Sequence, residues 1–157
     1  MQKIANKKTW GYIGRFLLIH VITYSIIGIL FLLVQDRLPT SNKMALEFYK
    51  PYRPLSFTVL FAQGLRGAVL AIILLPFQET IVKGNYGSLV LFGALWGLGV
   101  LGSLEPLPGS IEGLIYTETT LMEHFMVLTA SAVQIILFIR LFLCWEHKIV
   151  RLVDYYD

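Results

Sequence analysis

The sequence predicts an all-α integral membrane protein, a bundle of four transmembrane helices with ordered, partly interfacial outer loops. Hydrophobic residues make up 56% of the 157 residues and charged residues 15%, so the chain is more apolar and less charged than an average soluble domain. Four windows are long enough to cross a hydrocarbon core about 30 Å thick, which takes about 20 residues of helix. They lie at residues 12–34, 55–77, 86–104 and 122–145.

The first span follows Lys3, Lys7 and Lys8, as the core of a signal peptide would. Its apolar stretch is longer than the usual signal core of about 7 to 15 residues, and no small-residue cleavage site follows, so we expect a retained anchor. The four spans and their connections use nearly the whole chain, which predicts one domain over residues 1–157.

The first outer loop is expected to be ordered. Apolar side chains recur at helical spacing over residues 44–49, and Pro51 and Pro54 follow them, a pattern typical of a short amphipathic helix in the headgroup plane. An ordered loop with the interfacial tyrosines Tyr49 and Tyr52 is the alternative.

Arg66 lies near the middle of the second span. A charge at that depth costs about 3 kcal/mol, so it usually faces a protein interior or a wet cavity. We expect a polar interior around Arg66, shared with Gln63 of the same span and with Gln134 and His124 of the fourth. The alternatives are a structural ion pair with an acidic loop, snorkelling to the interface, and simple interhelical hydrogen bonds for the uncharged groups.

Small residues mark the faces on which helices are expected to pack. Gly64 and Gly67 lie in the second span, and Gly93 and Gly97 stand four residues apart in the third. Because such residues let helix backbones approach closely in lipid, they predict packing within the chain or between two copies.

The connection between the third and fourth spans is acidic, with Glu105, Glu112 and Glu123 in or beside it, whereas the first outer loop is basic and includes Arg53. Opposite charges on one side of the membrane predict a lid in which the two loops form ion pairs. Unrelated solvated charges are the alternative, because surface pairs contribute little.

Basic residues cluster at the span ends, so the net charge of +3 indicates membrane topology and excludes nucleic acid as the expected partner. With both termini in the cytoplasm, eight Lys and Arg residues lie inside and four outside, as the positive-inside rule favours. The chain is therefore expected to be a multi-pass integral membrane protein. The expected partners are membrane lipid and either a homo-oligomer or another membrane protein.

No metal, cofactor or catalytic residue is expected. His20 and His124 would differ in depth by about 18 Å along their helices, too far to flank one haem iron. Glu123 and His124 are adjacent and would point about 100° apart on a helix, so they lack the spacing of a metal site. No phosphate-binding glycine loop or nucleophile elbow occurs.

Three functions remain open from the sequence. The first is a transporter or channel subunit that binds a small solute, ion or anionic group around Arg66. The second is a non-enzymatic accessory or assembly subunit of a larger membrane complex. The third is an intramembrane enzyme acting on lipid, with Glu112 and His124 near headgroup depth. Because these residues do not have the spacing of a known catalytic pair, we favour the two non-enzymatic functions.

Overall fold

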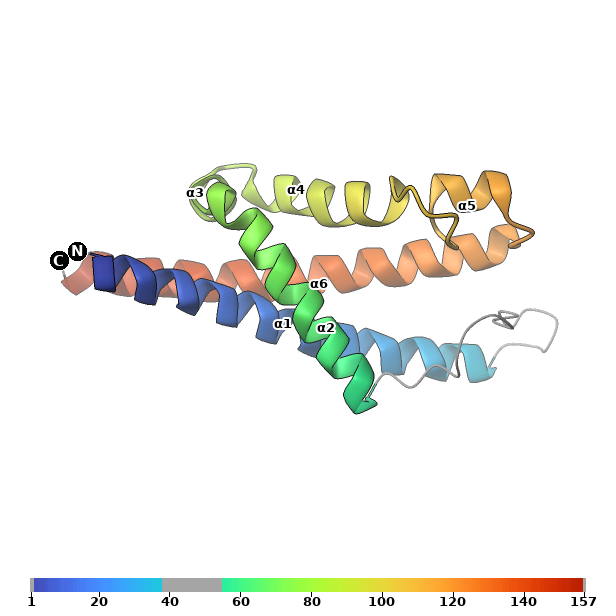
Figure 1. The fold of residues 1–157 in the computed structure, drawn as a ribbon, viewed down its shortest axis with the longest axis horizontal. Coiled ribbons are helices and arrows are strands. Elements are labelled where there is room, and N and C mark those ends of the chain that lie inside the picture. The colour runs from blue at the N-terminus through green and yellow to red at the C-terminus, as the bar shows by residue number, and fades with distance from the viewer. Residues whose placement is uncertain (1, 38–54, 157) are drawn as a thin grey trace.

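The computed structural model describes residues 2–37 and 55–156, and every regular element in them is helical. The two longest helices, α1 (Gln2–Arg37) and α6 (Leu121–Tyr156), bring both chain termini to the same end of the molecule (Figure 1). Between them come α2 (Phe57–Leu74), the 3₁₀ turn η2 (Leu75–Phe77), α3 (Gln78–Lys83), α4 (Gly87–Phe92), the π-helical segment η3 (Gly93–Leu101) and α5 (Ile111–Tyr116).

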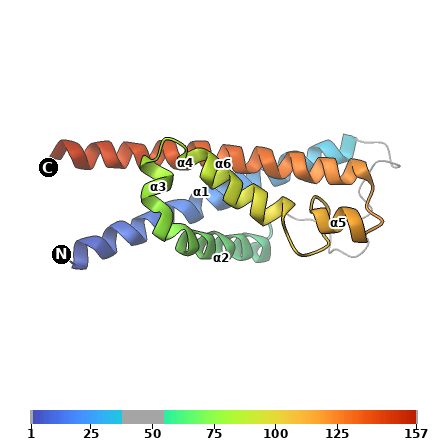
Figure 2. The ribbon, with the colours of Figure 1, turned by 90° about the horizontal axis from the view of Figure 1, so that it is seen from above.

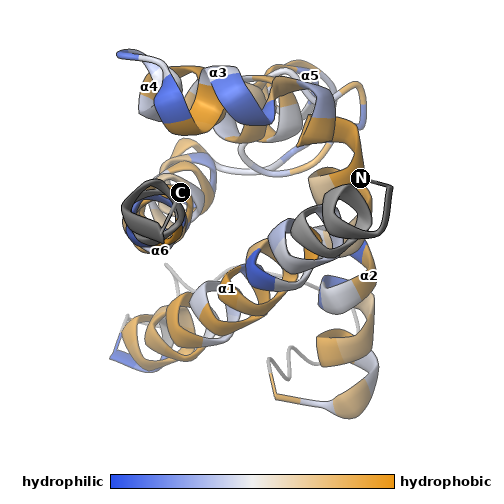
Figure 3. Ribbon diagram, turned by 90° about the vertical axis from the view of Figure 1, so that its left-hand side faces the viewer, coloured by the Kyte–Doolittle hydropathy of each residue, from blue (hydrophilic) through white to orange (hydrophobic). Residues whose placement is uncertain are grey.

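Three helical segments are long and apolar enough to span a membrane: Thr9–Val34, Phe57–Lys83 and Leu121–Ile149. Large apolar side chains on these segments, such as Leu33 and Phe125, are more than half exposed, which suits hydrocarbon better than water. Figure 3, seen from the end where the termini lie, shows hydrophobic residues along much of α1 and α2. The expected all-helical chain with apolar helices of membrane length is therefore found.

The expected third span is shorter than the sequence suggested. The helix formed by α4 and η3 covers Gly87–Leu101, which is about 22 Å by helical rise against about 30 Å of hydrocarbon. It ends at Gly102, whose N–H donates to the Gly97 carbonyl at 2.8 Å. Prolines at 106 and 108 follow, and without an N–H they cannot extend a helix interior.

The connection between the second and third expected spans, residues 78–85, is largely helical, because α3 covers Gln78–Lys83. Pro76 has no N–H to donate to a carbonyl four residues earlier, and the chain tightens there into η2 before continuing as α3. The helix ends at Gly84, whose N–H donates to the Thr80 carbonyl at 3.1 Å. Pro76 thus changes the helix type instead of ending the helix.

α1 and α6 pack through four buried aromatic side chains, Tyr12, Phe16, Phe138 and Phe142. The ring centroids of Phe16 and Phe138 lie 4.7 Å apart and those of Tyr12 and Phe142 5.4 Å apart, both edge to face, a geometry that contributes about 0.5 to 1.5 kcal/mol per pair. α2 crosses α1, and α4 with η3 lies along α6 (Figures 1 and 2).

Candidate functional site

Arg66 lies on α2 with an exposed side chain. It makes no hydrogen bond or ion pair with any residue that the structure describes, although it is close enough to His20 of α1 to interact with it electrostatically. The described part of the chain therefore does not surround this guanidinium with carboxylate or carbonyl oxygens.

Gln63 joins α2 to α1 one turn from Arg66. Its Oε1 lies 3.3 Å from Nε2 of His20, and because a carbonyl oxygen only accepts, the imidazole nitrogen is the donor. The close approach of the helices rests on Gly67, where a Cβ atom would meet Cδ2 of His20 at 3.2 Å and the Leu17 Cα at 3.3 Å. The polar residues of the first and second spans thus meet at this crossing.

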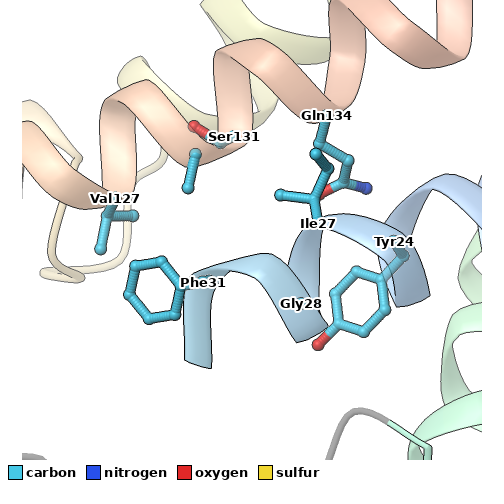
Figure 4. A pocket seen from close by; sticks show the side chains of 8 residues that line it. Tyr24, Ile27, Gly28, Phe31, Val127, Ser131 and Gln134 are labelled. Carbon is cyan, nitrogen blue, oxygen red and sulfur yellow. The ribbon is translucent and has the colours of Figure 1, made fainter. Parts of the chain in front are cut away.

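Gln134 lies elsewhere, in a groove between α1 and α6. Figure 4 shows side chains of both helices facing this groove, which has a volume of about 270 Å³. Its walls are nearly all apolar, and Gln134 forms no hydrogen bond with a described residue. Ser131, one turn away, instead accepts a hydrogen bond from the Trp96 indole at 3.2 Å.

His124 is buried where α6 meets the loop before α5. Its Nδ1 accepts a 2.9 Å hydrogen bond from the Gly109 N–H, so the proton of the neutral ring lies on Nε2. Nε2 is buried and has no hydrogen-bond partner among the described residues. Gly109 has φ +92°, a conformation that favours glycine.

Ser110 organises the same loop. Its Oγ accepts hydrogen bonds from the N–H groups of Gly113 at 2.9 Å and Leu107 at 3.2 Å, and it caps α5. The loop is therefore ordered by local hydrogen bonds, as its Pro-Gly composition allowed. His124 holds it on α6, about 15 Å along the helix from Gln134.

The four residues of the predicted polar centre are consequently distributed over three places. Gln63 and Arg66 lie at the crossing of α1 and α2, Gln134 lies in the groove, and His124 lies under the loop. No hydrogen bond joins one of these sites to another in the described part of the chain.

Of the acidic residues of the predicted lid, Glu123 has a local role. Oε2 of Glu123 accepts hydrogen bonds from the N–H and Oγ1 of Thr120 at 2.8 and 2.9 Å, and Thr120 Oγ1 accepts from the Glu123 N–H at 3.3 Å, which is a capping box at the start of α6. Glu105 and Glu112 form no ion pair with a described residue. Arg53 lies outside the described residues, so the predicted ion pairs between the loops stay a prediction.

The remaining glycines singled out by the sequence have open surroundings. A Cβ atom at Gly64, Gly93 or Gly97 would meet nothing within 4 Å, in contrast to Gly67. The faces of these three glycines are unoccupied by the described residues, and their role in packing between copies stays a prediction.

A buried ion pair was not anticipated from the sequence. Arg15 of α1 lies with Nε 2.5 Å from Oε1 of Glu146 on α6, and the side chains are 18% and 3% exposed. The hydroxyl of Tyr12 is buried in the same region without a hydrogen-bond partner among the described residues. A signal was present: with both termini on one side, residues 15 and 146 fall at the same end of the first and fourth spans.

Within the described residues, no group of three or more His, Cys, Asp and Glu side chains is placed to hold a metal ion. The fold and these sites define an all-helical protein with several helices of membrane length, a buried ion pair and an open arginine on α2. Comparison with known proteins gave no match to a family model, to a curated protein or to a solved structure.

Proposed function

We propose that this chain is an accessory or assembly subunit of a larger membrane complex, in which α2 packs beside a transmembrane helix of another membrane protein. The observation that carries the proposal is Arg66, exposed in an apolar helix and without an ion-pair partner among the described residues. A charge left against hydrocarbon at that depth costs about 3 kcal/mol. A carboxylate on a neighbouring helix would offset that cost.

The partner helix is expected to carry an intramembrane Asp or Glu. The acids that this chain places in its long apolar helices lie toward their ends, Glu79 in Phe57–Lys83 and Glu123 and Glu146 in Leu121–Ile149. Glu79 is about 20 Å from Arg66 along the helix. A second copy aligned with the first would therefore offer no acid at the depth of Arg66, which favours a different protein.

The membrane arrangement belongs to the same proposal: four crossings, with α4 and η3 as a short third span, and both termini in the cytoplasm. The apolar composition of Gly87–Leu101 supports the additional crossing, and the excess of basic residues on the side of the termini supports the orientation.

A transporter or channel subunit that binds an anionic solute at Arg66 is the second candidate. The observation that favours this function is the location of Arg66 near His20 and Gln63, which are hydrogen-bonded to each other. A small anion bound to the guanidinium would therefore have further polar side chains nearby.

The experiment compares the wild-type chain with Arg66→Gln after mild solubilisation from native membranes, with complex mass measured by native mass spectrometry. Lys83→Gln is the matched control, because Lys83 is an exposed cation on the same Phe57–Lys83 segment. We expect a stoichiometric foreign membrane protein with the wild type and with Lys83→Gln, and its loss with Arg66→Gln.

Two results would overturn the accessory role. The first is a wild-type chain that is isolated alone or as an integral multiple of its own 17.8 kDa mass. The second is a foreign protein that Arg66→Gln retains fully. A lone wild-type chain that small anions stabilise against thermal unfolding, with loss of the effect in Arg66→Gln, would favour the solute-binding role instead.

A further inference from the structure

A cleft of about 850 Å³ opens between α4 and α6, apart from the crossing of α1 and α2. Leu89 and Phe92 of α4 and Leu143 of α6 contribute apolar walls, and Arg140 and His147 of α6 contribute polar groups. The volume is in the range of ligand sites, about 300 to 1,000 Å³. The cleft therefore has apolar walls next to the cationic side chain of Arg140.

The cationic part lies in the section of the apolar α6 segment that is nearer the chain termini. The segment runs from Leu121 to Ile149, so Arg140 lies about 28 Å along the helix from its first residue and about 14 Å from its last. Both chain termini lie at this end of the molecule (Figure 1).

Arg140 is exposed and forms no hydrogen bond or ion pair with a described residue. The acids of the same region are already engaged, since Glu146 pairs with Arg15 and Glu79 lies 3.5 Å from the Lys83 ammonium. An anion for Arg140 must therefore come from outside the described part of the chain.

The His147 ring is held in place on the same side of the cleft. Its Nε2 lies 2.7 Å from the Val82 carbonyl oxygen, and because that oxygen only accepts, Nε2 is the donor. This hydrogen bond fixes the ring between α6 and the end of α3, so that it forms a stable edge of the cleft beyond Arg140.

We propose that this cleft binds an anionic phospholipid of the leaflet nearest the chain termini, with its phosphate at Arg140 and an acyl chain along Leu89, Phe92 and Ile136. A guanidinium gives phosphate two parallel donors, and basic pockets between transmembrane helices are typical sites for anionic headgroups. A soluble anion would leave the apolar walls unused, and an uncharged hydrophobic molecule would leave Arg140 without a counter-charge. This site is independent of the proposed role of Arg66.

The test measures lipid retention by the full-length chain in detergent, by native mass spectrometry, with phosphatidylglycerol and phosphatidylcholine added in equal amounts. The wild type should retain phosphatidylglycerol preferentially, and Arg140→Gln should lower that preference at least about tenfold, as expected when the charged hydrogen bonds to the phosphate are lost. Lys148→Gln is the matched control, because it removes an exposed cation on α6 outside the cleft and should leave the preference unchanged.

Leu89→Trp gives a second arm that does not depend on the arginine. Leu89 is 66% exposed and lines the cleft, so a larger side chain should fill the acyl channel and lower retention of both lipids without disturbing the buried core. Equal retention of the two lipids by the wild type would overturn the proposal, as would a preference that survives in Arg140→Gln. Displacement of the lipid by millimolar inorganic phosphate would assign the site to a soluble anion, which also overturns it.

Discussion

The buried ion pair between Arg15 and Glu146 predicts an asymmetric response to single substitutions. Arg15→Met leaves the Glu146 carboxylate, 3% exposed, without its counter-charge, whereas Glu146→Gln leaves an arginine that is 18% exposed and keeps more contact with its surroundings. Breaking a buried pair costs about 3 to 5 kcal/mol. We expect Arg15→Met at the upper end of that range and Glu146→Gln at the lower end.

The double variant removes both charges and should lose about 1 to 2 kcal/mol, because two neutral side chains leave no unpaired charge in the interior. With single losses of about 5 and about 3 kcal/mol, the coupling energy of the cycle should be about 6 kcal/mol. Tyr12→Phe is the control in the same region: the buried hydroxyl has no hydrogen-bond partner among the described residues, so its removal breaks no hydrogen bond of the described chain and should leave the stability unchanged or raise it.

The assay is equilibrium unfolding of the purified chain in mixed micelles, followed by circular dichroism of the helical signal. Single variants whose losses simply add in the double variant would refute the ion pair as a coupled unit. A larger loss for Glu146→Gln than for Arg15→Met would refute the argument from exposure.

Two further predictions concern helix packing and the α6 loop. Gly67→Val should destabilise the chain by about 1 to 3 kcal/mol through overpacking against Leu17, because even a Cβ atom there would lie 3.3 Å from the Leu17 Cα. Gly93→Val is the control, because a Cβ atom at Gly93 would meet nothing within 4 Å. Equal melting temperatures of the two variants would contradict the close approach of α1 and α2. His124→Leu should cost about 1 to 3 kcal/mol because it leaves the Gly109 N–H buried without its acceptor. His124→Asn places an oxygen near the position of Nδ1 and should recover part of that loss in thermal unfolding, whereas equal losses in the two variants would contradict the role of this hydrogen bond.

The long helices were predictable because their signal is local. An apolar run of about 20 residues indicates a span wherever the rest of the chain lies, and α1, α2 and α6 follow that rule with shifted boundaries. The third helix was overestimated because the glycines from Gly93 to Gly102 count as apolar in a window, although they weaken a regular α-helix. The segment is π-helical in the structure and ends at Leu101.

Contacts between side chains far apart in the sequence were harder to predict. Arg15 and Glu146 are 131 residues apart, and only the packing of α1 against α6 brings them together. The same holds for the loop before α5: its prolines exclude a long regular helix, but nothing in the sequence indicates that the Gly109 N–H would donate to Nδ1 of His124. Helical periodicity places side chains on a face, and it does not say which neighbour that face meets.

The three segments long enough to span a membrane contain one arginine each, and the different surroundings of these arginines support the proposed role of α2. Arg15 has Glu146 because residues 15 and 146 lie at equal depth when both termini share one side. Arg140 lies in the section of the α6 segment nearer the chain termini, about 28 Å along the helix from Leu121, where the proposed phospholipid would supply a counter-charge. Arg66 has neither: it lies near the middle of its apolar stretch, and the acids of the spans stand toward their ends. Within the described residues, stability of the isolated fold therefore gives no reason for a cation at this position, whereas an acidic helix packed against α2 does.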